Sequence, residues 1–75
     1  MTLAELPVGS RGTVRKVLGS TPVIHRLMEM GLVPGAPVRV LRVAPLGDPL
    51  ELDLRGYRLA LRRREAAFFE VEAGS

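Results

Sequence analysis

The most regular alternation of apolar and charged positions lies in the segment from residue 50 to residue 61. Its first half places leucine at every second position: Leu50, Leu52 and Leu54. A period of two is typical of a strand with one buried face. A turn at Arg55-Gly56 would place Leu52 opposite Leu59, and Asp53 opposite Arg58 as an ion pair on the solvent face. The segment therefore predicts a β-hairpin.

A helical period replaces this alternation between Pro22 and Met30. Five apolar residues fall within an arc of about 160° on a helical wheel, namely Val23, Ile24, Leu27, Met28 and Met30. Thr21 is a suitable N-cap, and proline is favoured at the first helical position. Gly31 can adopt the left-handed conformation that ends a helix, with Leu32 packing back against the last turn. We expect one α-helix here.

Shorter apolar segments predict the remaining strands at residues 12–18, 38–43 and 69–71. The apolar alternation breaks after Val14 and again between Val40 and Leu41, which a β-bulge in each strand would explain. Pro34-Gly35 predicts a type II turn, and residues 63–66 predict a short connector. The order of elements predicts a mainly β fold in a single domain of residues 1–75. Its architecture would be a small SH3-like five-stranded barrel with one inserted α-helix.

Composition narrows the function classes. The chain has 75 residues, of which 47% are hydrophobic, and no cysteine. A chain this short builds only a marginal core, so a binding module is favoured over an enzyme with a deep pocket. The absence of cysteine excludes disulfides, thiol catalysis and cysteine metal sites, and favours a reducing cytoplasm. We see no signal peptide and no apolar run that could insert into a membrane. With one histidine, we assign no catalytic residue.

The net charge of +3 comes largely from arginine, and Arg62-Arg63-Arg64 is the one basic run. It is interpreted either as a solvated rim or as a contact for an acidic partner surface or anionic lipid headgroups. A nucleic-acid-binding barrel is an alternative function. The few aromatic residues and Glu65 beside the run argue against that alternative.

Two further features allow a functional and a structural interpretation. His25 and Glu29 stand four residues apart on one helix face, a spacing that could hold a divalent metal. Two ligands do not complete a site, so we predict no cofactor and only weak metal binding, or a metal that bridges two copies in a crystal. The segment from Pro45 to Pro49 lacks the spacing of a phosphate-binding loop. Asp48 is expected to bond backbone amides in this turn or to contact a partner.

Nearly the whole chain resembles the ferrous iron transport protein A (FeoA) family. The most specific matches are Arg26-Leu27-Met28-Glu29-Met30-Gly31-Leu32 with Pro34-Gly35, and then Ala44-Pro45-Leu46-Gly47-Asp48-Pro49. The resemblance implies a small cytosolic barrel that serves bacterial or archaeal ferrous iron uptake. Its implied partner is the cytosolic part of the membrane permease FeoB, whose transport of Fe(II) it would modulate. A metal-responsive domain like that of the diphtheria-toxin-type repressors is a second alternative.

The apolar arc of the helix is wider than the roughly 100° stripe that faces one core. Part of it is therefore expected to contact the partner. The predicted partner-binding residues are Leu27, Met28, Met30, Leu32, Asp48, Arg62 and Arg63. The chain would be cytoplasmic and would reach the inner face of the membrane through its partner.

Overall fold

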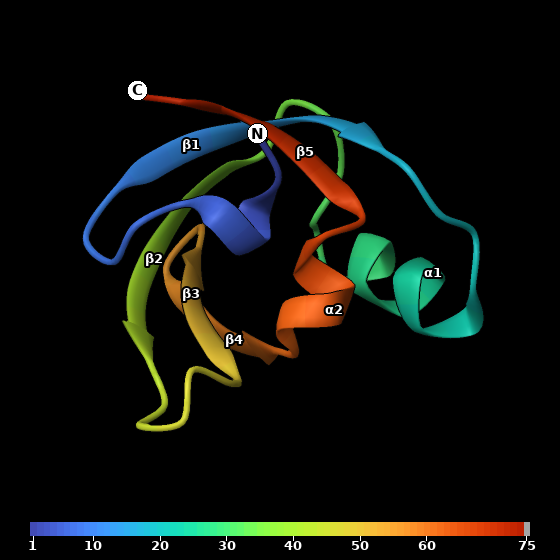
Figure 1. Cartoon of the computed structure of the whole chain (residues 1–75). Coiled ribbons are helices and arrows are strands. Elements are labelled where there is room, and N and C mark those ends of the chain that lie inside the picture. The colour runs from blue at the N-terminus through green and yellow to red at the C-terminus, as the bar shows by residue number, and fades with distance from the viewer. Residues whose placement is uncertain (75) are drawn as a thin grey trace.

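A computed structural model describes residues 1–74. Five strands form one antiparallel sheet in the order β4-β3-β2-β1-β5, and this sheet curves around the core (Figure 1). The strands are β1 (Arg11–Val17), β2 (Pro37–Val43), β3 (Leu50–Leu54), β4 (Tyr57–Leu61) and β5 (Phe69–Ala73). The helices are α1 (Pro22–Glu29), α2 (Arg63–Ala66) and a short 3-10 helix, η1 (Leu3–Glu5). The predicted mainly β fold with an inserted helix is confirmed, and η1 is an addition that the sequence pattern did not indicate.

The hairpin of β3 and β4 has the predicted register. Leu52 pairs with Leu59, and Asp53 pairs with Arg58. The turn residues Arg55 and Gly56 have positive φ angles of 54° and 96°, as a two-residue hairpin turn requires. The expected ion pair is wrong, because the Asp53 carboxylate accepts a hydrogen bond from the Gly56 amide at 3.1 Å instead. In the described chain, Asp53 therefore holds the turn and forms no salt bridge with Arg58.

Both predicted bulges are present. The pairing of β1 with β5 shifts register between Val14 and Lys16, and that of β2 with β3 shifts between Val40 and Arg42. A bulge bends its strand and increases the local twist. The bends let a sheet of short strands curve around a core in which Val14 and Val40 are fully buried.

The sheet of the described residues has two edges, because its strand order is linear and does not close into a ring. Strands β4 and β5 are its two outer strands. The N-terminal residues cover the outer side of β5, where Thr2 forms a bridge with Glu70 and the Val71 amide donates to the Met1 carbonyl at 2.9 Å. Exposed strand edges favour pairing with other chains, and this cover removes one such edge.

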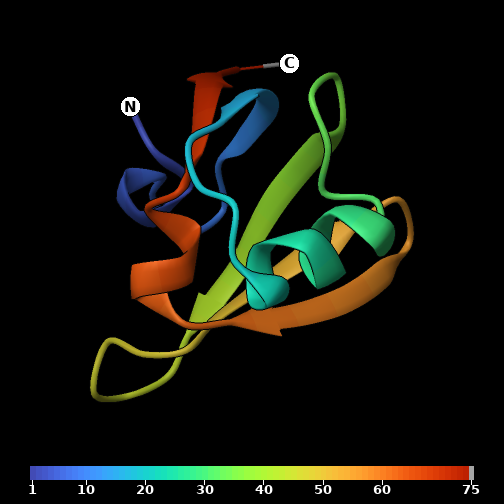
Figure 2. The same cartoon turned by 90° about the vertical axis from the view of Figure 1, so that its right-hand side faces the viewer.

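Helix α1 begins and ends as its sequence predicts. The Thr21 hydroxyl accepts a hydrogen bond from the Ile24 amide at 3.2 Å. Gly31 has a φ of 112°, and the Leu32 amide bonds back to the Leu27 carbonyl at 3.1 Å. Met30 is the C-cap rather than the last helical residue. Figure 2 views the molecule from the side of α1 and shows this helix in front of the hairpin of β3 and β4.

Candidate partner-binding surface

The four apolar residues predicted to contact a partner differ in how far they are buried. Leu27 is only 6% exposed and Leu32 is 0% exposed, so the assignment of these two side chains to a partner surface is wrong. The turn at Gly31 directs the chain back so that Leu32 enters the core. Met28 is half-buried against the core, and Met30 is 39% exposed. The solvent-exposed part of the apolar arc therefore lies at the edges of the arc.

An apolar groove runs between α1 and α2. It is a shallow, open groove with a volume of about 590 Å³. Its lining residues are Thr21, Val23, Ile24, Arg64, Glu65, Ala67 and Phe68, which together we call the α1–α2 groove. Val23 is 41% and Phe68 is 39% exposed. Large apolar side chains left this open beside each other are typical of an interaction surface.

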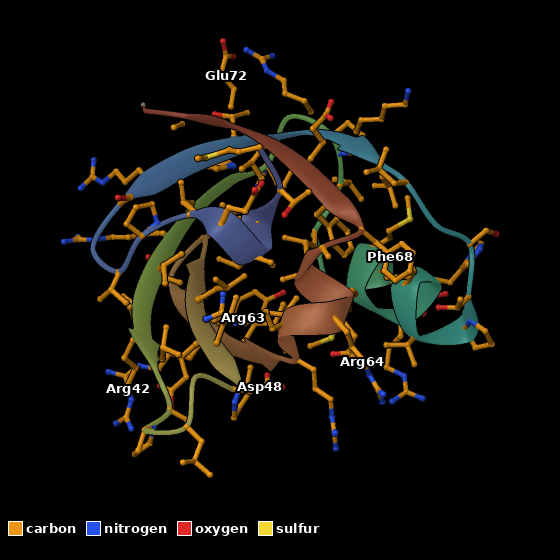
Figure 3. All side chains as sticks on the ribbon, viewed as in Figure 1. Arg42, Asp48, Arg63, Arg64, Phe68 and Glu72 are labelled. Atoms are coloured by element: carbon orange, nitrogen blue, oxygen red, sulfur yellow. The ribbon has the colours of Figure 1, made fainter. Side chains whose placement is uncertain are left out.

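Phe68 is held in this position by local packing. A Cβ atom added to Gly19 would lie 2.7 Å from the Phe68 ring, so the ring rests directly on the Gly19 backbone. Figure 3 shows Phe68 beside α1. Its neighbour Phe69 is fully buried, because successive residues entering a strand face opposite sides. Two adjacent aromatic residues at the start of a strand indicate that one of the two rings is exposed. The sequence analysis did not use this signal and did not assign Phe68 to the partner surface.

Charged residues border the groove on the α2 side. Arg64 and Glu65 both line it. The Glu65 carboxylate also accepts a hydrogen bond from the Arg62 amide at 2.8 Å, which caps the start of α2. Arg62 itself is exposed. The arrangement is an apolar floor with a polar rim, the usual anatomy of a protein interface.

Asp48 and Arg63 were also predicted to contact a partner. In the structure they form hydrogen bonds that link the 44–49 loop to α2. The Arg63 amide donates to the Asp48 carboxylate at 2.9 Å, and its guanidinium donates to the carbonyls of Gly47 at 3.0 Å and Ala4 at 2.6 Å. These bonds join the 44–49 loop, α2 and η1, and Figure 3 shows Arg63 beside Asp48. The geometry assigns both residues a structural role. Both remain exposed, so their contact with a partner stays a prediction.

We expect Arg63→Ala to lower the free energy of unfolding by about 1–2 kcal/mol, because it removes the two guanidinium bonds that join separate segments. Urea denaturation followed by circular dichroism measures this. The matched control is Arg64→Ala, which removes a neighbouring arginine at the groove rim and should change the value by less than about 0.5 kcal/mol. Equal losses in the two variants would contradict the structural role of Arg63.

The candidate metal ligands remain on the exposed face of α1. His25 Nε2 lies 3.0 Å from the Ser20 hydroxyl. Within residues 1–74, no three or more histidine, cysteine, aspartate or glutamate side chains gather where they could hold a metal ion. Weak or bridging metal binding at His25 and Glu29 stays a prediction.

Among residues 1–74, no helix has the length and apolar character needed to span a membrane.

A family model and a curated relative identify the family of this chain. The family model described as the FeoA domain matches residues 1–73. The Fe(2+) transport protein A/Fe(2+) transporter FeoB fusion protein of Porphyromonas gingivalis is 39% identical over 72 residues, which are 96% of this chain and 8% of the fusion protein. This chain thus matches a small part of that relative.

Two solved structures extend the comparison to the fold. The FeoA protein of Chlorobium tepidum is 45% identical with a TM-score of 0.92, over 100% of this chain and 71% of that one. The FeoA of Stenotrophomonas maltophilia, solved with zinc, is described as a prokaryotic SH3-domain protein and a candidate ferrous iron transport activating factor. It is 38% identical with a TM-score of 0.82, over 96% of this chain and 89% of that one. These matches confirm the predicted SH3-like fold, and none of them implies an enzyme family. The chain belongs to the FeoA family, which is linked to ferrous iron transport.

Proposed function

We propose that this protein is a non-enzymatic accessory protein that binds the cytosolic part of an FeoB-type permease and modulates Fe(II) transport from the cytoplasmic side. The fusion protein of Porphyromonas gingivalis supports FeoB as the partner, because in that protein an FeoA part and an FeoB transporter belong to one polypeptide. Covalent linkage keeps two modules at high effective concentration, an arrangement suited to modules that act on each other.

The α1–α2 groove is the surface that fits such a partner best. Val23 and Phe68 supply exposed apolar area, and Met30 lies at the other end of α1. Methionine adapts to irregular partner surfaces because its side chain is flexible and polarizable. Arg64 adds positive charge at the rim of the groove, which would favour an acidic rim on the permease.

Modulation of transport requires differential binding. A ligand shifts a conformational equilibrium only by the difference between its affinities for the two conformations. The accessory protein would therefore prefer one conformation of the permease's cytosolic part. A small surface of this kind is typical of a reversible complex rather than a permanent one.

The test measures binding between this protein and the purified cytosolic domain of the FeoB-type permease from the same organism. Calorimetry should give a one-to-one complex with a dissociation constant on the order of micromolar. Addition of the protein should also change the rate of Fe(II) uptake by the full permease in liposomes. Absence of binding at about 100 µM of each protein would overturn the proposal. Salt-sensitive binding to random-sequence DNA or RNA in its place would favour the nucleic-acid alternative.

A further inference from the structure

One row of charged side chains crosses four neighbouring strands of the sheet. Arg11 of β1 pairs with Arg39 of β2, Arg39 pairs with Asp53 of β3, and Asp53 pairs with Arg58 of β4. Residues paired in this way lie on the same face of a sheet. The row therefore contains three arginines and a single carboxylate.

One pairing in this row is unfavourable for folding alone, and no carboxylate of the row is free to compensate for it. Like charges directly opposite each other on adjacent strands destabilise a sheet, and Arg11 faces Arg39. The Asp53 carboxylate is already engaged with the Gly56 amide at 3.1 Å. The salt bridges found within residues 1–74 lie elsewhere, between Arg15 and Glu72 and between Arg42 and Glu51. An accumulation of charge that stability does not explain is expected where a protein binds a ligand.

A cavity opens at this end of the sheet. It is open to solvent, has a volume of about 270 Å³ and is lined by Arg11, Gly12, Thr13, Pro37, Val38, Arg39, Asp53, Arg55 and Gly74. Arg55 comes from the hairpin turn, where its positive φ of 54° is a conformation in which asparagine or aspartate is more usual. Three guanidinium-bearing residues from three segments thus surround one hollow.

We propose that this cavity binds a small polyvalent phosphate, a diphosphate or triphosphate group. The guanidinium group presents a planar fork of donors that matches phosphate oxygens in a bidentate manner. Arg11, Arg39 and Arg55 outweigh Asp53 in charge, so a multiply charged anion is favoured over a singly charged one. The hollow shape favours a small soluble ligand over the flat surface of a membrane. The cavity shares no lining residue with the α1–α2 groove, so this inference does not depend on the proposed permease complex.

Calorimetry with inorganic pyrophosphate and tripolyphosphate tests the proposal directly. We expect the intact protein to bind with a dissociation constant of about 100 µM or tighter, and orthophosphate to bind less tightly. Arg39→Gln should weaken binding at least about tenfold. The matched control, Arg42→Gln, makes the same change on the same strand outside the cavity and should stay within about twofold. Asp53→Asn should strengthen binding, since it removes a negative charge and its amide oxygen can still accept from Gly56.

Thermal unfolding of Arg11→Gln provides a second measurement. Without phosphate, this variant should melt at the same temperature as the natural protein or higher, because it removes the repulsion between Arg11 and Arg39. Pyrophosphate at millimolar concentration should raise the midpoint of the natural protein, and the rise should be lost in the variant.

Three outcomes would overturn the proposal. In the first, pyrophosphate neither releases heat nor raises the midpoint. In the second, Arg42→Gln weakens binding as much as Arg39→Gln, so that only net charge matters. In the third, the protein binds vesicles containing phosphatidylglycerol while free pyrophosphate does not compete, which would identify a lipid surface as the ligand.

Discussion

Leu52→Ala should lower the free energy of unfolding by about 2–5 kcal/mol. Leu52 is 0% exposed and lies in β3, between β2 and β4 in the sheet. It pairs with Val40 on one side and with Leu59 on the other. Truncation removes apolar contacts and leaves a cavity that the sheet cannot collapse to fill. Since small domains are stable by only about 5–15 kcal/mol, a large share of the stability would be lost.

Urea denaturation followed by circular dichroism measures this loss. The chain offers a control with the same chemical change, because Leu46 in the 44–49 loop is 97% exposed. Leu46→Ala should alter the free energy of unfolding by less than about 0.5 kcal/mol. A Leu52→Ala variant as stable as Leu46→Ala would show that the hairpin register is wrong.

Phe68→Gln should reduce binding to the permease's cytosolic domain by about tenfold or more while leaving the protein folded. Aromatic side chains that fill a partner's pocket commonly dominate the binding energy of an interface. Phe68 is half-exposed at the α1–α2 groove, and so is Val23. Val23→Gln and Met30→Gln should weaken binding in the same direction. A native circular dichroism spectrum must accompany each loss.

Two further variants make this result decisive. Val8→Gln changes an exposed valine that is not part of the groove and should bind normally. Leu27→Gln places a polar group in the core and should unfold the domain, which distinguishes core residues of α1 from residues at its surface. If Phe68→Gln, Val23→Gln and Met30→Gln all bind like Val8→Gln, the groove is not the contact surface, and the exposed Arg62 becomes the next residue to test.

The local patterns of the sequence determined much of this fold. Alternation and the Arg55-Gly56 turn gave the register of the hairpin, which pairs Leu52 with Leu59. Thr21 and Gly31 marked the two ends of α1. Caps, turns and strand periodicity depend on residues a few positions apart, so their physical causes are visible in the sequence itself.

The tertiary structure alone decided which residues are available for function. Leu27 and Leu32 share an apolar pattern with Met30, yet only packing against the sheet shows which side chains are buried. The Arg63 guanidinium donates a hydrogen bond to the carbonyl of Ala4, near the other end of the chain. Arg63 therefore has a structural role that the sequence of three consecutive arginines does not reveal. Arg11 and Arg39 gather at one cavity only because β1 and β2 pair in that register. Each of these outcomes depends on contacts between residues distant in sequence, which local patterns do not specify.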